Sequence, residues 1–186
     1  MWILKKVYYF FVDTIQSILI AASFFLIIYM FIARPFQVNG ESMYPSFQDG
    51  EYVLTNLITL RFSPPKVGDV VVFRAPPDPE KDFIKRIIAM TGDTVMIKEG
   101  AVYVNGRKVD ESLYLKSDIK TYSGSFLKES ETITVPEESF FVMGDNRPYS
   151  SDSREWGFVK KTAMIGKSFF IYWPIPKAAF VQNPYK

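Results

Sequence analysis

One hydroxyl group in the chain stands in a setting where it could act as a nucleophile. Ser42 lies in the stretch Gly40-Glu41-Ser42-Met43-Tyr44-Pro45, which begins seven residues after a long apolar run. A serine beside Gly and Pro is usually a turn residue. A serine becomes a nucleophile only where a neighbouring base takes its proton. The chemistry of Ser42 therefore depends on which residue can be that base.

The chain contains no Cys and no His. A thiol nucleophile, a disulfide framework, a thiolate metal site, a Ser-His-Asp triad and the zinc-protease helix motif are therefore all excluded. The acid or base catalyst must be Lys, Tyr, Asp or Glu. We expect neither a metal nor a cofactor.

A lysine can be the base only if its amine is neutral near physiological pH, and this requires burial, which lowers a lysine pKa by about 3 to 5 units in fully buried sites. Lys85 is the best candidate. Strand alternation in Phe83-Ile84-Lys85-Arg86-Ile87-Ile88 places Lys85 on one face with Phe83 and Ile87. An alternative stays open, in which Lys85 protects an exposed edge strand from aggregation.

A third polar cluster directly follows the apolar residues 140–143. It runs from Gly144 to Arg154 and contains Asp145, Arg147, Asp152 and several hydroxyl groups. It can be interpreted as a turn-rich loop. It can also be interpreted as a set of carboxylates, guanidinium groups and hydroxyls that orient a catalytic amine.

A membrane helix is predicted over residues 15–33, whose only polar members are Gln16, Ser17 and Ser23 when Tyr29 is counted as apolar. About 20 such residues span a bilayer. A cleaved signal sequence is the alternative, but its apolar region would be about 7 to 15 residues with small residues at the cut. Lys5 and Lys6 before the helix, against Arg34 after it, predict a short cytoplasmic segment, residues 1–14, and an extracytoplasmic domain.

Residues 34–186 are predicted to form one β-rich domain, because short apolar runs alternate with Gly, Pro, Asn and Asp. Asn105-Gly106 is a strong signal for a tight hairpin. A polar stretch near 111–131 is expected to be a variable insertion, and 168–176 is either a core strand or an aromatic surface that touches lipid. The candidate strands are 52–56, 70–74, 83–89, 94–98, 101–104, 107–109, 132–135, 140–143 and 164–172.

The charge balance argues against nucleic-acid binding. The chain has 186 residues, with 22 Lys and Arg against 20 Asp and Glu, so its net charge is +2. This lacks the basic footprint of a nucleic-acid binder. The length suits one anchor and one compact domain.

Taken together, these stretches closely resemble the type I signal peptidases, in the short form of Gram-positive bacteria. These are membrane-bound serine proteases that cut signal peptides from exported proteins. The resemblance covers nearly the whole chain and is carried, in order, by the anchor and by residues 40–45, 68–73, 85–93 and 144–154. Several motifs in the family's order are far more specific than any one of them.

The resemblance implies a mainly β fold, with one transmembrane helix followed by an antiparallel β-sheet catalytic domain of the signal peptidase and self-cleaving repressor type. It implies Ser42 as nucleophile and Lys85 as general base. Ser150 is expected to hydrogen-bond the Lys85 amine, and four residues are expected to support the site, namely Asp145, Arg147, Asp152 and Arg154. The Ser42 amide is the expected oxyanion donor. Gly40 replaces a hydroxyl residue found in some members, so the second donor is left as a backbone amide or water.

The resemblance also implies cleavage after small residues, with Met43, Phe83 and Ile84 as candidate pocket walls. The expected partners are signal peptides and membrane lipid, with no nucleic acid, and the protein is expected to be a monomer in the bacterial cell membrane. Residues 33 to 42 span at most about 30 Å, so Ser42 should lie near the membrane. Two alternatives remain: a self-cleaving repressor, which would need a DNA-binding domain, and a membrane-anchored β domain that binds a partner without chemistry.

Overall fold

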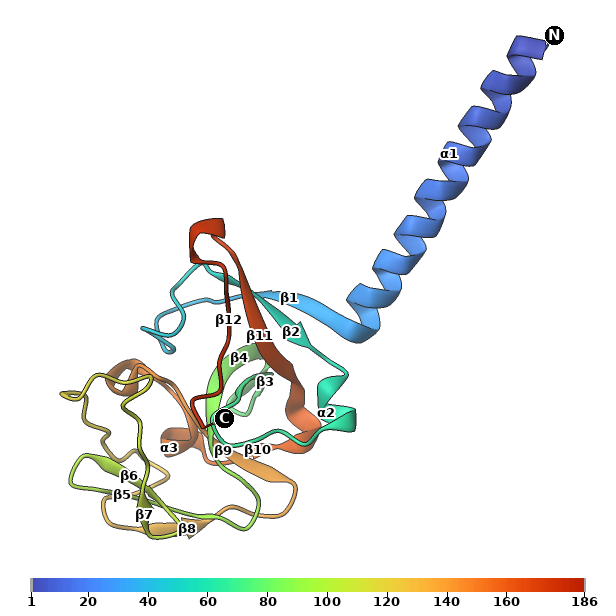
Figure 1. The fold of residues 1–186 in the computed structure, drawn as a ribbon. Coiled ribbons are helices and arrows are strands. Elements are labelled where there is room, and N and C mark those ends of the chain that lie inside the picture. The colour runs from blue at the N-terminus through green and yellow to red at the C-terminus, as the bar shows by residue number, and fades with distance from the viewer. Residues whose placement is uncertain (1, 186) are drawn as a thin grey trace.

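The computed structural model describes residues 2–185, apart from the side chains of residues 60 and 61, and consists of one long N-terminal helix and a β-rich domain (Figure 1). Helix α1 spans Trp2–Ile27 and continues as one turn of π-helix, η1, over Ile28–Ile32. Together they form an apolar helix of 31 residues. The part of this helix that is apolar enough to cross a membrane has no residue buried in the protein.

The helix differs in its bounds from the predicted membrane span of residues 15–33. It begins at Trp2, and Ala33 is already the first residue of a strand. Hydropathy marks the part of a helix that suits lipid, whereas backbone hydrogen bonding continues through polar residues such as Lys5 and Lys6. At 1.5 Å per residue, 31 residues extend about 46 Å, which exceeds the roughly 30 Å hydrocarbon core.

The domain is built from two antiparallel sheets. The larger has the order β1-β2-β11-β3-β4-β9-β10, with β12 added beside β11, and the smaller has the order β7-β6-β5-β8. The strands of the larger sheet are β1 Ala33–Gln37, β2 Tyr52–Asn56, β3 Val70–Ala75, β4 Asp78–Ala89, β9 Ser139–Met143, β10 Val159–Lys160, β11 Met164–Trp173 and β12 Ala179–Phe180. Those of the smaller are β5 Thr94–Lys98, β6 Ala101–Val104, β7 Arg107–Lys108 and β8 Thr132–Thr134.

The helical pieces of the domain are short. They are α2 Thr59–Phe62, α3 Ser153–Trp156 and the 3-10 turns η2 Arg147–Tyr149, η3 Lys161–Ala163 and η4 Ile175–Lys177. The mainly β, antiparallel fold predicted from the sequence is confirmed by these elements.

All nine predicted strands are present, with small changes at their ends. The largest change is in β4, which begins at Asp78 inside the proline-rich stretch because Ala75 and Asp78 pair across a tight turn. The predicted hairpin at Asn105-Gly106 joins β6 to β7, and both residues have positive φ, 52° and 74°. Strands β1, β10 and β12 were not predicted.

The stretch 111–131 contains no named helix or strand among the described residues. It is nevertheless packed against the domain, because Tyr114, Leu115 and Leu127 are buried. The run 168–176 is mostly strand β11, which pairs with β2, β3 and β12, so the core-strand interpretation holds, while Trp173 and Ile175 at its end are exposed.

Candidate active site

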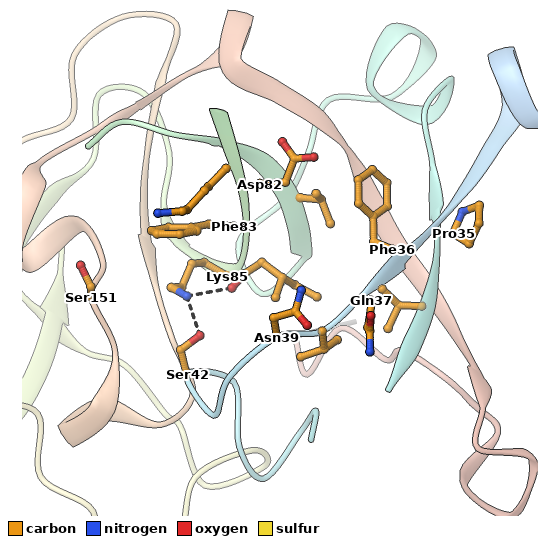
Figure 2. A pocket seen from close by; sticks show the side chains of 14 residues that line it. Pro35, Phe36, Gln37, Asn39, Ser42, Asp82, Phe83, Lys85 and Ser151 are labelled. Atoms are coloured by element: carbon orange, nitrogen blue, oxygen red, sulfur yellow. Dashed lines mark hydrogen bonds between the residues drawn. The ribbon is translucent and has the colours of Figure 1, made fainter. Parts of the chain in front are cut away.

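Ser42 and Lys85 meet in the structure. The Lys85 Nζ atom lies 2.6 Å from Ser42 Oγ and also donates to the carbonyl oxygen of Ile84 at 3.1 Å (Figure 2). A distance of about 2.6 to 3.2 Å is the range required of a nucleophile and its base. The two side chains come from a loop and a strand that are 43 residues apart.

Strand β4 places Lys85 in the interior. Lys85 pairs with Val71 of β3 on one side, and from Arg86 onward β4 also pairs with β9. Lys85 is only 3% exposed. This burial contradicts the alternative of a solvated lysine that protects a strand edge from aggregation, although among the described residues β4 has no pairing partner at Lys85 on the side away from β3.

Burial lowers the pKa of the Lys85 amine from 10.5 to about 8. Loss of hydration is the largest cause, because a charged ammonium is poorly stabilised away from water. The carboxylates of Asp152 and Asp145 oppose the shift, and the guanidinium of Arg154 reinforces it. The neutral amine that a general base needs is thus accessible near physiological pH.

The loop that carries Ser42 is held in place by packing against the core and by hydrogen bonds. Met43 and Phe47 are buried in the core beside Val38 and Val53. Asn146 donates two hydrogen bonds to this loop. Its backbone amide donates to the Ser42 carbonyl and its Nδ2 donates to the Glu41 carbonyl, both at 3.0 Å. The nucleophile loop is therefore attached directly to the polar cluster that follows β9.

Within the described part of the chain, the backbone amide of Ser42 has no hydrogen-bond acceptor. The Gly40 amide is occupied, since it donates to Asp49 Oδ1 at 2.7 Å. Gly40 has a φ of 85°, a conformation that suits glycine, and it turns the chain into the Ser42 loop. The role of Gly40 is thus a matter of backbone shape, because its own amide is already used.

Ser150 lies close to the pair but does not form the predicted bond. Its Oγ is buried and has no hydrogen-bond partner among the described residues, so the expected contact with the Lys85 amine is not made. Gly144 separates Ser150 from the nucleophile loop. A Cβ at Gly144 would lie 2.2 Å from Ser150 Oγ and 2.3 Å from the Ser42 carbonyl oxygen.

The four predicted supporting residues are all buried near the pair. Asp152 accepts two hydrogen bonds from the Arg154 guanidinium, each at 2.8 Å, and one from the Gly144 amide at 3.0 Å. Arg154 also donates to the Arg147 carbonyl at 2.7 Å. These bonds connect Gly144, Arg147, Asp152 and Arg154 to one another and so constrain the backbone of residues 144–154.

Three partners of this cluster were not singled out from the sequence. Asp145 is paired with Arg86, and Arg147 is paired with Glu111 and Thr121. Arg86 could have been found, because strand alternation turns it to the face opposite Lys85, where a buried guanidinium needs a carboxylate. Glu111 lies in an irregular segment that offers no such periodic signal.

A cleft of about 740 Å³ opens beside the pair. One wall is β1 and the residues after it, from Pro35 to Asn39, and the other is β4 from Lys81 to Lys85 (Figure 2). Phe83 and Ile84 line the cleft, as predicted. Met43 does not, because its side chain points into the core.

The chain is similar to known proteins over most of its length. A family model described as "Signal peptidase, peptidase S26" matches residues 11–173. Signal peptidase IB of Staphylococcus aureus (strain MRSA252) is 34% identical over 183 residues, which is 92% of this chain and 94% of that protein. Signal peptidase I of Bacillus caldolyticus is 36% identical over 157 residues, which is 81% of this chain and 85% of that protein.

Among solved structures, a signal peptidase I from Enterococcus faecalis V583 aligns with a TM-score of 0.46 and 30% sequence identity. The alignment covers 55% of this chain and 95% of that one. The family model and the relatives extend over most of the sequence, and the residues matched by the family model include every residue of the site described above. The chain belongs to the signal peptidase family, peptidase S26.

Proposed function

We propose that this protein removes N-terminal signal peptides from exported preproteins, with Ser42 as the nucleophile and Lys85 as the general base. One observation carries the assignment of roles. In a chain without histidine, a buried lysine whose pKa lies at about 8 stands 2.6 Å from a serine hydroxyl in an open cleft. Membership of the signal peptidase family supports the substrate class.

The reaction is an acyl transfer in two halves. The neutral Lys85 amine takes the proton from Ser42 Oγ, which attacks the scissile carbonyl carbon and forms a tetrahedral intermediate. The Lys85 ammonium then returns the proton to the departing amine, and the acyl-enzyme remains. In the second half Lys85 deprotonates a water molecule, which attacks the ester and releases Ser42. No step requires a metal or a cofactor.

The Ser42 amide is the first donor to the oxyanion, since it is adjacent to the nucleophile and has no other acceptor within the described chain. Such a donor typically contributes about 2.7 to 4 kcal/mol to lowering the barrier. Gly40 is not the second donor through its own amide, which Asp49 occupies. The second donor is therefore another backbone amide or a water molecule.

The walls of the cleft suit an extended peptide. Within the described residues, β1 pairs only with β2, so its other edge is free. In the same part of the chain β4 pairs with β9 only from Arg86 onward, so residues 82–85 are free on the side away from β3. A substrate strand can form backbone hydrogen bonds with such edges. Phe83 and Ile84 line this cleft and limit the space beside Ser42, which favours small residues before the cut.

The helix of residues 2–32 supports a membrane-anchored enzyme. We propose a single-pass topology with residues 1–14 cytoplasmic and the peptidase domain, 34–186, outside, because two lysines precede the apolar span and one arginine follows it. The exposed Trp173, at the end of β11, and the exposed Ile175, in η4, suit contact with lipid. We propose a monomer that does not bind nucleic acid, since the net charge of +2 lacks the basic footprint of a nucleic-acid binder.

The test is processing of a preprotein by the purified full-length chain carrying Ser42→Ala or Lys85→Ala. Each variant should lose at least about 1000-fold in rate, because the two side chains act as a unit. The matched controls are Ser151→Ala and Lys81→Ala, a second serine and a second lysine that line the same cleft without contacting the pair. Their rates should stay within severalfold of wild type. Normal processing by either Ser42→Ala or Lys85→Ala would show that the Ser-Lys assignment is wrong. No processing by the wild-type chain would instead indicate a membrane-anchored binding domain without this chemistry.

A further inference from the structure

A second cavity, of about 690 Å³, lies where the membrane helix enters the domain. Met30 and Phe31, from the last turn of the helix, form part of its lining, and so does Arg34 of β1. The Leu57 amide donates to the Ile32 carbonyl at 2.9 Å and ties the helix end to the segment between β2 and α2, which Figure 1 shows beside it. The cavity therefore sits at the level where an apolar helix leaves the bilayer.

The cavity combines apolar and cationic side chains. Arg34, Arg74 and Lys161 are its cations, and Asp82 is its one carboxylate. Lys161 already bonds to Glu138 at 3.0 Å. Arg74 stands in register with Asp82 on the neighbouring strand, but the two form no ion pair within the described chain. Two guanidinium groups thus remain available to an anion.

Arg34 gives the more specific indication. Its Nε is buried and has no hydrogen-bond partner among the described residues. Buried donors in proteins are nearly always paired, because leaving one unpaired loses its hydration without replacement. The Arg34 guanidinium carbon lies 5.8 Å from the centre of the Tyr29 ring, which belongs to η1, so this group lies beside the helix end. An acceptor from outside the chain would satisfy it.

We infer that this cavity binds the phosphate of an anionic phospholipid from the leaflet next to the peptidase domain. A phosphodiester accepts paired hydrogen bonds from arginine. The lipid's acyl chains would lie along Met30 and Phe31, which are 56% and 61% exposed, and Phe62 of α2, which is 84% exposed, adds apolar surface at the same rim. The bound lipid would fix the angle of the domain relative to the membrane. It would also fix the position of the substrate cleft, because Asp82 lines both cavities.

This site depends on membrane anchoring and not on the catalytic assignment, so its test includes a lipid-binding measurement. The full-length chain is placed in nanodiscs of equal amounts of phosphatidylglycerol and phosphatidylcholine, and lipids retained after release are identified by native mass spectrometry. Wild type and Ser42→Ala should both retain phosphatidylglycerol in preference to phosphatidylcholine. The double variant Arg34→Gln/Arg74→Gln should lose this preference by about fivefold for each arginine removed.

The matched control is Arg107→Gln/Lys108→Gln, which removes the same charge from exposed positions on β7 in the smaller sheet. It should retain phosphatidylglycerol as wild type does. Equal retention by the cavity variant and wild type, or equal loss in the control, would overturn the proposal. Arg34→Lys, which keeps the charge but not the paired contact, should lose part of the preference, and it provides a second measurement if the double variant folds poorly.

Two further measurements test whether something other than a phospholipid occupies the cavity. In detergent without lipid, the double variant should process a preprotein at the wild-type rate. A loss of processing there, with an unchanged unfolding temperature, would show that the cavity binds substrate and would overturn the lipid assignment. Inorganic phosphate added to wild type in phosphatidylcholine discs should leave the unfolding temperature unchanged. A rise that the double variant lacks would indicate a site for small anions instead.

Discussion

Arg86 donates two hydrogen bonds to Asp145, from Nε to Oδ1 at 2.9 Å and from Nη2 to Oδ2 at 2.7 Å. Arg86 follows the proposed base in β4, and Asp145 lies one residue before Asn146, which bonds to the Ser42 carbonyl. This buried pair therefore joins the strand that carries Lys85 to the loop that positions Ser42.

Replacing Asp145 with Asn should destabilise the protein strongly. The change leaves the Arg86 guanidinium, which is 3% exposed, without its counter-charge, and breaking a buried pair in this way typically lowers the free energy of unfolding by about 3 to 5 kcal/mol. We expect the thermal unfolding midpoint in detergent, followed by circular dichroism, to fall by roughly 10 °C. Asp118→Asn, at an exposed carboxylate, should leave it unchanged, and equal midpoints for the two variants would contradict a structural role for the pair.

Gly144→Ala should lower kcat by more than its loss of folding stability can explain. The added Cβ would stand 2.3 Å from the Ser42 carbonyl oxygen, so the nucleophile loop must shift. A displacement of about 1 Å at a reacting group can cost roughly 100-fold in rate, and we expect a fall of that size in kcat.

The control for Gly144→Ala is Gly166→Ala, whose Cβ would meet the Asn56 carbonyl oxygen at 2.5 Å, in the sheet and away from the pair. Both variants should unfold at lower temperature, but only Gly144→Ala should lose activity out of proportion. Similar losses of kcat in both would show that the Gly144 effect is a general loss of folding.

The rate of processing should rise with pH through the pKa of Lys85. Because the base acts as the neutral amine, kcat/KM should increase about tenfold per pH unit below pH 8 and level off above it. The measurement is kcat/KM for a signal-peptide substrate between about pH 6 and about pH 10. A profile that falls with rising pH through this window would contradict Lys85 as the base.

Burial of Lys85 should also lower the stability of the fold. Its pKa is about 8 in the folded chain and near 10.5 when unfolded, so below pH 8 both states hold the proton and the folded state carries a poorly hydrated charge. Stability should then rise with pH between about 8 and 10.5, where the unfolded chain binds more protons. At 1.36 kcal/mol per pKa unit, this contribution is about 3 kcal/mol.

Lys85→Met, which removes the charge and keeps a side chain of similar length, should therefore be more stable than wild type at neutral pH. This gain in stability over wild type should shrink as the pH approaches the pKa of the lysine in the unfolded chain. The comparison is made by denaturant unfolding of both proteins at each pH, since pH effects shared by the two then cancel. A pH-independent difference would argue that Lys85 is not buried as an ammonium.

Local patterns predicted much of the fold. Strands such as 52–56, 94–98 and 101–104 were found with their exact ends, because alternation of apolar residues and turn signals are read within a few neighbouring positions. Strands β1, β10 and β12 were missed. Two of them have only two residues, and β1 merges with the end of the apolar membrane run, so none offers a periodic signal.

The site divides in the same way. The absence of histidine and cysteine favours lysine as the base for Ser42, and the apolar face of residues 83–88 identifies Lys85 from the sequence alone. The predicted hydrogen bond between Ser150 and Lys85 is not formed. The prediction that Met43 lines the pocket is also wrong, because its side chain lies in the core. Both depend on side-chain direction in loops, which no alternation rule specifies.

The sequence by itself determined the chemical types available, the membrane anchor and most strands, since these follow from composition and short-range periodicity. Only the tertiary structure decided that Arg86 pairs with Asp145, that Arg147 pairs with Glu111, and that the edges of β1 and β4 enclose the cleft. These contacts join residues far apart along the chain. They exist because the sheet curves and its loops pack together, and local preference cannot specify that packing.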